Sequence, residues 1–300
     1  MSEHTARAAH LAAAFPMRAA TCARYYAQAP QQAGADGSKT WITRGANFVV
    51  ALTDAQAGTA FERAFDRTGE RDGQPDEYMV LLAPGAGAVV EAGGARIESP
   101  GDALFIVPPG ASRVTATGAG RITRIFTHRA ADLCALAENA AAYADGAPEV
   151  APIKPWPDPV GGFRLRHYPL EKYLEPVTFG RLFRSTNLMV NVFEPTTTPR
   201  DPKKLSPHAH ADFEQGSLSL SGTVVHHLRT PWAADSTTWH EDAHEEFHSP
   251  ALLVIPANLV HTTQYTGGGP NWFVDIFSPP RLDFSEKPGW VRNADEYPMP

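Results

Sequence analysis

Three short segments in the first half of the chain recur, in the same order, in the second half. The distance between the copies grows slowly along the chain, as small loop insertions would produce. One such match would carry little weight, but three in one order predict two copies of one domain. The pairs are residues 44–50 with 184–190, 103–108 with 251–256, and 120–126 with 271–277.

The repeated segments are short, apolar and rich in β-branched residues. Clusters of Gly, Pro and Asp separate them, and the 300 residues include 24 glycines and 27 prolines. This composition favours many turns and short strands over long helices, so we predict an all-β fold with a few short helices. Strands are expected at residues 48–52, 78–82, 104–107 and 122–126.

A helical pattern and a proline-rich segment separate the two copies. Residues 130–144 place apolar side chains on one helical face, with Asp132 as the expected N-cap, and residues 147–159 form a stiff connector. The expected regions are therefore an N-terminal arm or helix (1–38), a β domain (39–130), a helix and Pro-rich linker (131–160), a second β domain (161–280) and a tail (281–300).

Charge and composition exclude several classes of protein. The net charge of −7 argues against a nucleic-acid binder, which needs a basic face. We find neither a targeting segment nor an apolar run of the roughly 20 residues that a membrane helix requires. We expect a cytoplasmic monomer or homodimer that binds a small molecule and neither nucleic acid nor a membrane.

The side chains available for metal binding are histidines rather than cysteines. Cys22 and Cys134 are the two cysteines, which excludes a disulfide scaffold and a Cys-rich zinc site. Twelve histidines direct any metal chemistry toward nitrogen and oxygen ligands. His208 and His210 are two residues apart, so on a strand they share one face, and His261 is a candidate ligand from a distant strand.

These histidines stand in segments that resemble the two paired motifs of the cupin superfamily. The first motif has the form G-x5-H-x-H-x3,4-E-x6-G, and His208, His210 and Gly222 match it. The second has the form G-x5-P-x-G-x2-H-x3-N. Here Pro256 and His261 match, and Asn258 replaces the usual Gly. The resemblance implies two jelly-roll-like, double-stranded β-helix barrels, a bicupin, with one divalent metal ion in the C-terminal barrel.

Other positions of the two motifs differ from the family pattern. Pro202 and Pro250 stand where each motif has its leading Gly, and Tyr265 replaces the final Asn of the second motif.

The fourth ligand is open between two adjacent residues. Counting back from Gly222 reaches Gln215, whereas Glu214 fits the shorter spacing after the histidines. A carboxylate neutralises a divalent ion better than an amide does. Gln215, however, shares a strand face with the polar Ser217, and we favour Gln215 with Glu214 as the alternative.

The N-terminal copy resembles the same fold without its metal. Residues 101–113 closely match the second motif, with Arg113 in the place of the histidine, and residues 70–77 contain no histidine. A guanidinium repels a cation. We therefore expect this barrel to be structural or to hold an anion.

Four further residues are candidates for the pocket of the C-terminal barrel. His226 and Tyr265 are the nearest candidates for proton transfer, and His226 fits a buried core histidine equally well. Ser217 and Thr263 are candidates for substrate binding. The ion could be Fe, Mn, Ni or Zn, because all four accept nitrogen and oxygen ligands.

The resemblance implies a metal-dependent enzyme that acts on a small organic substrate. An Fe(II)-type dioxygenase or oxidoreductase is the leading hypothesis. A redox-inert ion would instead support an isomerase, decarboxylase or lyase. A non-catalytic bicupin that binds a small molecule is the third possibility, since one fold hosts many functions.

Overall fold

The structure is a computed structural model, and it describes residues 17–63, 74–174 and 180–300. Contacts divide the chain into two compact units, and both are discontinuous in sequence. The first barrel comprises the described residues of 29–144, 153–189 and 278–300. The second barrel comprises those of 1–28, 145–152 and 190–277. This division differs from the expected consecutive regions, because segments distant in sequence add to each barrel.

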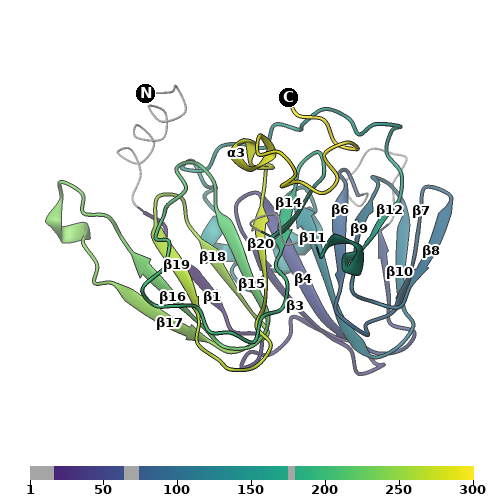
Figure 1. Cartoon of the computed structure of the whole chain (residues 1–300), viewed down its shortest axis with the longest axis horizontal. Coiled ribbons are helices and arrows are strands. Elements are labelled where there is room, and N and C mark those ends of the chain that lie inside the picture. The colour runs from purple at the N-terminus through teal and green to yellow at the C-terminus, as the bar shows by residue number, and fades with distance from the viewer. Residues whose placement is uncertain (1–16, 64–73, 175–179) are drawn as a thin grey trace. The chain divides into compact units, whose positions relative to one another are not determined.

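The first barrel contains two antiparallel sheets. The larger has the order β12-β9-β6-β11-β4-β3-β2, and the smaller has the order β5-β10-β7-β8 (Figure 1). Apolar side chains between them form the core, including Val80, Phe105 and Phe126. The strands are β2 (Gln32–Ala33), β3 (Lys39–Arg44), β4 (Phe48–Ala55), β5 (Ala60–Arg63), β6 (Tyr78–Leu82), β7 (Ala88–Ala92), β8 (Ala95–Ser99), β9 (Ala103–Val107), β10 (Ser112–Ala116), β11 (Gly120–Thr127) and β12 (Arg166–Pro169).

The second barrel repeats this design. Its larger sheet contains the order β1-β18-β15-β20-β14, and its smaller sheet has the order β17-β16-β19 (Figure 1). Its core includes Val224, Phe247 and Phe273. The strands are β1 (Thr21–Ala23), β14 (Met189–Val192), β15 (Gln215–Ser221), β16 (Val224–Arg229), β17 (Ala243–Phe247), β18 (Ala251–Ile255), β19 (Val260–Tyr265) and β20 (Trp272–Phe277).

The two copies expected from the sequence are confirmed in the strand order. The order β9-β6-β11-β4 of the first barrel corresponds to β18-β15-β20-β14 of the second. The outermost strand of each series comes from elsewhere in the chain. β12 pairs with β9, and β1 pairs with β18. A sheet edge accepts such a strand because its backbone groups need hydrogen-bond partners.

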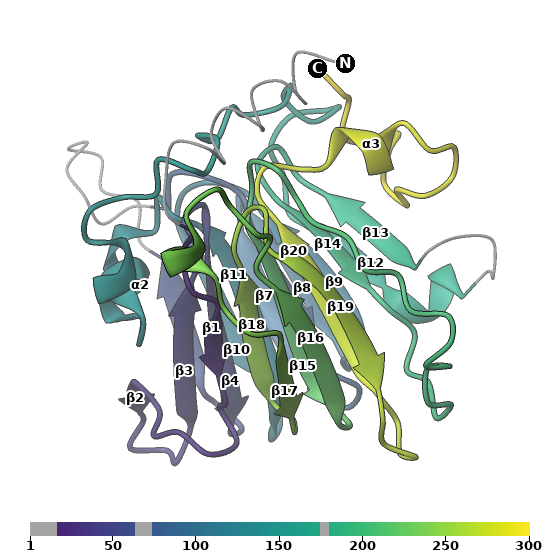
Figure 2. The same cartoon turned by 90° about the vertical axis from the view of Figure 1, so that its left-hand side faces the viewer.

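The predicted strands lie within β4, β6, β9 and β11, but the predicted helix is only partly present. Residues 130–144 form a short helix, α2 (Ala131–Leu136), followed by a 3-10 turn, η1 (Ala140–Tyr143). α2 lies beside β3 (Figure 2). Asp132 does not cap the helix, because its carboxylate instead accepts hydrogen bonds from Arg63 at 2.6 and 3.0 Å.

The remaining elements are short. They are the strand β13 (Arg181–Arg184), the 3-10 turns η2 (Leu170–Tyr173) and η3 (Ser236–Thr238), and the helix α3 (Leu282–Ser285). Within the described residues, no helix combines the length and the apolar character that a membrane crossing requires.

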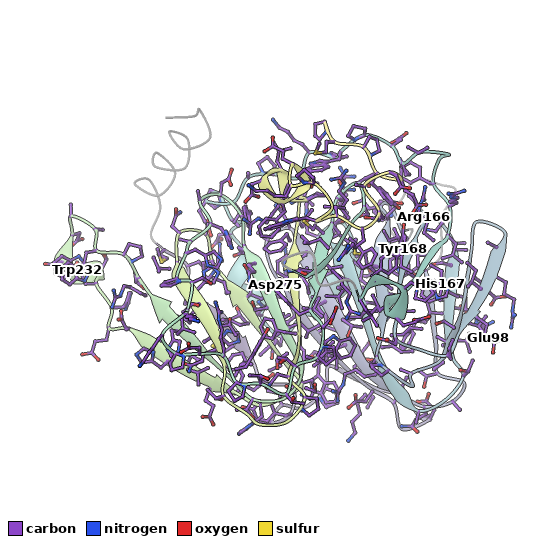
Figure 3. All side chains as sticks on the ribbon, viewed as in Figure 1. Glu98, Arg166, His167, Tyr168, Trp232 and Asp275 are labelled. Atoms are coloured by element: carbon purple, nitrogen blue, oxygen red, sulfur yellow. The ribbon has the colours of Figure 1, made fainter. Side chains whose placement is uncertain are left out.

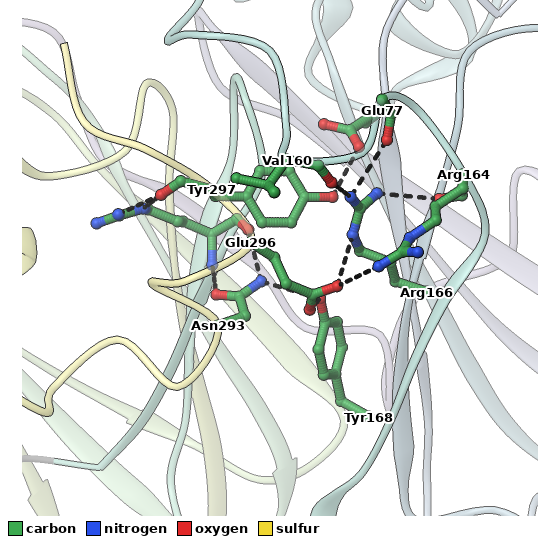
Figure 4. A network of polar contacts seen from close by, with 10 residues as sticks. Glu77, Val160, Arg164, Arg166, Tyr168, Asn293, Glu296 and Tyr297 are labelled. Atoms are coloured by element: carbon green, nitrogen blue, oxygen red, sulfur yellow. Dashed lines mark hydrogen bonds and ion pairs between the residues drawn. The ribbon is translucent and has the colours of Figure 1, made fainter.

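Buried polar contacts hold the C-terminal tail in the first barrel (Figure 4). The Tyr297 hydroxyl donates to Glu77 Oε1 at 2.7 Å, and Arg184 Nε donates to the Tyr297 carbonyl at 3.0 Å. Glu296 accepts from Arg166 Nε at 3.0 Å and from the Tyr168 hydroxyl at 2.6 Å. Burial raises the pKa of Glu77, whereas its bond to Tyr297 lowers it.

The substitution Tyr297→Phe should therefore destabilise the protein by about 1–3 kcal/mol, because it leaves a buried carboxylate without one donor. Losing that donor also raises the pKa of Glu77 in the folded state further. A raised folded pKa favours folding at low pH and opposes it as pH rises, so the loss should be larger at pH 7 than near about pH 4. Urea unfolding at both pH values measures it. Tyr26→Phe, at a more exposed tyrosine, is the control, and an equal loss in both variants would contradict the prediction.

Candidate metal centre

Three histidines of the second barrel converge at one point. Their ligand nitrogen atoms all lie within 4.8 Å of one another. Backbone pairing brings them together, because the His261 N–H donates to the His208 carbonyl at 2.8 Å and the His208 N–H donates back at 3.1 Å. His210 and His261 are buried, and His208 is exposed. The cluster therefore has one side open to solvent.

The turn before β19 ties the third histidine to the other two. Asn258 adopts a left-handed conformation with φ of 67°, and its N–H donates to the His210 carbonyl at 2.5 Å. Asn tolerates this conformation better than most residues, which explains how it serves where the cupin motif has Gly.

Hydrogen bonds orient two of the three imidazoles. His208 Nδ1 lies 2.9 Å from the Ser206 carbonyl, and His261 Nδ1 lies 2.9 Å from the Leu259 carbonyl. A carbonyl oxygen only accepts, so each Nδ1 carries the proton and donates. Each Nε2 is then the unprotonated nitrogen, which is the form and the support that a metal-binding histidine needs.

Gln215, the first residue of β15, points its amide oxygen at this cluster. Its Oε1 lies 2.8 Å from His210 Nε2. Its Nε2 donates to Ser217 Oγ at 3.0 Å and to Asp275 Oδ1 at 2.9 Å. Because a carboxylate only accepts, Asp275 determines which end of the amide faces the histidines.

Asp275 is the residue that the sequence analysis missed. It lies on β20, paired with Ser217 of β15, and Figure 3 labels it among the strands of the second barrel. Its one sequence signal is a carboxylate inside the apolar run 272–277. Asp275 also accepts from Ser217 Oγ at 3.1 Å, so Ser217 supports the amide rather than facing the cluster alone.

Glu214 has different neighbours. It precedes β15, is 2% exposed, and its Oε1 lies 3.9 Å from Arg18 Nε. Arg18 also donates to Glu149 at 2.8 Å. The Glu214 carboxylate thus lies next to Arg18, whereas the Gln215 amide lies next to His210. The identity of the fourth ligand stays a prediction, for which the geometry favours Gln215.

The other pocket candidates lie on β16 and β19 of the same barrel. His226 Nδ1 lies 2.9 Å from Thr263 Oγ1, and burial lowers the pKa of His226 to about 3, so its imidazole is neutral at physiological pH. Burial, reinforced by the charge of Asp275, raises the pKa of Tyr265. Tyr265 is therefore a neutral phenol, which can donate a hydrogen bond and holds its proton more tightly than a free tyrosine does.

Arg113 of the first barrel does not take the expected place of the histidine. Its side chain is 54% exposed and its Nε lies 3.3 Å from Glu62 Oε1 on the outer face of the barrel. Ser112, its neighbour, is the buried residue. A shift of one residue moves a side chain to the other face of a strand, and motif spacing alone did not detect this shift.

The substitution Gln215→Ala should weaken metal binding by about tenfold or more, because it removes an oxygen ligand. Asp275→Asn should also weaken it, since the Gln215 amide is then free to rotate. Competition with a chromogenic chelator for Zn(II) measures both effects. Glu214→Gln is the matched control and should bind as the wild type does. A large loss in Glu214→Gln alone would identify Glu214 as the ligand.

Comparison with known proteins finds likeness in structure and not in sequence. Neither the protein-family models nor the curated proteins gave a match. The protein Ylba from E. coli superposes with a TM-score of 0.54 at 11% identity, covering 89% of this chain and 94% of that one.

Two oxalate decarboxylases have the same arrangement. The Bacillus subtilis enzyme gives a TM-score of 0.52 at 13% identity over 93% of this chain and 84% of that chain. The Lactobacillus farciminis enzyme gives 0.50 at 14% identity over 81% of each chain. Identities this low establish the fold alone. The chain therefore shares the fold of these proteins, with two jelly-roll barrels in one chain, which is the bicupin fold that the motif resemblance implies.

Proposed function

We propose that the second barrel holds one divalent transition-metal ion and that the protein is a metal-dependent enzyme acting on a small organic substrate. The ligands would be Nε2 of His208, His210 and His261, with Gln215 Oε1 as the fourth. The observation that carries the proposal is the cluster of three imidazoles within 4.8 Å, two of them held by backbone carbonyls at Nδ1.

The charge of this ligand set points to the class of substrate. Three imidazoles and an amide are all neutral, so they leave the charge of a divalent ion uncompensated. A substrate that binds through carboxylate, enolate or phenolate oxygens would supply the missing negative charge. A catalytic site also needs open ligand positions, and the exposed side at His208 provides access for such a substrate.

When bound, the ion would supply either oxygen activation, as Fe(II) does, or polarisation of a carbonyl or carboxylate. The residues of the barrel have complementary roles. The neutral phenol of Tyr265 would donate a hydrogen bond to the substrate, and His226 bound to Thr263 is a neutral hydrogen-bonding group. The rings of Phe213 and Phe277 pack against His210 and exclude water from the inner side.

Two reaction classes follow from this site. The leading one is an Fe(II)-type dioxygenase or oxidoreductase, because neutral ligands with open positions suit an anionic chelating substrate together with dioxygen. The second is a decarboxylase, isomerase or lyase, which the fold likeness to oxalate decarboxylases supports. The Bacillus subtilis oxalate decarboxylase has Mn(II) centres.

Elemental analysis of protein purified without a metal-affinity column tests the metal centre. We expect close to one equivalent of Fe, Mn, Ni or Zn in the wild type and its loss in the double variant His208→Ala/His261→Ala. The matched control is His227→Ala/His244→Ala. It removes two histidines that contact each other at 2.7 Å on the surface, and it should keep the metal. A wild type that stays metal-free after anaerobic reconstitution would refute the proposal.

The choice of reaction is tested on the reconstituted protein. Oxygen uptake with catechol-like and diketone substrates, lost on chelation and restored by Fe(II) alone, would support the dioxygenase. Release of carbon dioxide from small dicarboxylates with Mn(II), without net oxygen uptake, would support the decarboxylase. Retention of ligand binding after chelation, with no turnover under any ion, would identify a non-catalytic binding protein.

A further inference from the structure

The inside of the first barrel has its own set of polar side chains, at the strand positions that form the metal centre in the second. Arg124 pairs with Val80 across β11 and β6, as Asp275 pairs with Ser217 across β20 and β15. Arg124 therefore occupies the position of Asp275.

The residue two before Val80 on β6 is Tyr78, which corresponds to Gln215, two before Ser217 on β15. The ring of Tyr78 stacks on Phe126 with centroids 4.6 Å apart, so it faces the barrel interior.

The smaller sheet gives the corresponding positions for the histidines. Ser112 pairs with Arg63 of β5, as His261 pairs with His208. The other neighbour of β10 gives the same correspondence. Ala116, four residues after Ser112, pairs with Ala88 of β7, and Tyr265, four residues after His261, pairs with Val224 of β16. The register is thus the same along the whole strand. Ser112 therefore occupies the position of His261, and Arg63 occupies the position of His208.

Every one of these four replacements is a hydrogen-bond donor. Two are guanidinium groups, of Arg63 and Arg124, and two are hydroxyls, of Tyr78 and Ser112, whose oxygen atoms lie 2.9 Å apart. Both guanidinium groups lie over the ring of Phe126, at 5.3 and 6.0 Å from its centroid. The cluster is therefore compact. Its positive charge and hydrogen-bond donors suit an anion and would repel a cation.

The positive charge of this cluster is only partly neutralised. Asp132 binds Arg63 with both carboxylate oxygens. Arg124 is 6% exposed, and among the described residues its Nε has no hydrogen-bond acceptor. Its guanidinium stacks on Phe61 at 3.9 Å, a cation–π contact that gives the Nε–H no acceptor. Burial lowers the pKa of Arg124 to about 10, so it remains charged at neutral pH.

A buried guanidinium with an unsatisfied N–H is costly, and an anion with oxygen acceptors would remove that cost. We propose that the interior of the first barrel binds a small carboxylate anion, held by the Arg124 guanidinium with the hydroxyls of Tyr78 and Ser112. Arg63 and Ser112 also line an open pocket of about 560 Å³, whose other lining residues include Glu62 and Arg113 of the outer face. The proposal does not depend on the metal centre of the second barrel.

The test measures thermal unfolding with added sodium formate or acetate in the His208→Ala/His261→Ala background, where a carboxylate has no metal to bind. Saturating formate should raise Tm by about 2 °C or more, and isothermal titration should detect one site. Arg124→Leu should abolish both signals without lowering Tm in formate-free buffer, because Leu suits the contact with Phe61. Arg113→Leu, on the outer face of the same barrel, is the matched control and should keep both signals.

Ser112→Ala is a second variant, which should fold even if Arg124→Leu does not. We expect it to weaken formate binding at least threefold. Sodium chloride and sodium sulfate at the same concentration test the class of anion. A Tm rise with these salts and none with formate would overturn the carboxylate assignment. A rise with formate that persists in Arg124→Leu would overturn the site, as would its absence in the parent background.

Discussion

The reciprocal backbone pairing of His208 with His261 is the contact on which the candidate metal centre depends. His208 lies in a loop outside the named strands, and these two hydrogen bonds tie it to β19. The turn at Asn258 holds His210 in the same way, through its backbone carbonyl. Backbone geometry thus brings the three histidines together before any metal contributes. His210 Nε2 donates to Gln215 Oε1 in this arrangement, so it would exchange that hydrogen bond for an ion.

The next layer of contacts decides what the placed groups can do. A glutamine amide offers a metal either an oxygen atom or an NH₂ group, and only the oxygen binds a cation. Asp275 and Ser217 hold the NH₂ end, so the oxygen faces His210. The partly buried carboxylate of Asp275 thereby adds negative charge close to the site without occupying a ligand position. This is the usual role of a residue behind the ligands.

The two barrels show how one register can carry opposite chemistry. At matching strand positions, the second barrel has histidines, an amide and a carboxylate, whereas the first has guanidinium groups and hydroxyls. The same strand pairing accommodates both groups of side chains, because the hydrogen bonds between strands use main-chain groups and not side chains. The two barrels therefore differ in the polar side chains that face the interior, while apolar side chains form the core of both.

Much of this design was predictable from the sequence alone. The recurring segments predicted two β domains, because a strand records its buried face in apolar residues of fixed spacing. The paired motifs predicted that His208, His210 and His261 meet, and they do. The expected reason, a strand face shared by His208 and His210, is wrong, because both lie in the loop before β15.

Only the tertiary structure decided the rest, which depends on pairing between distant segments. It showed that Ser112 and not Arg113 faces inward, because a loop shifted the register by one residue. It placed Asp275 next to the Gln215 amide, and it buried Arg124 with no hydrogen-bond acceptor for Nε among the described residues. It also showed that β1, near the start of the chain, joins the second barrel, and that β12, from the second half, joins the first. A sequence specifies local periodicity, but which strands become neighbours is settled by the packing of the whole sheet.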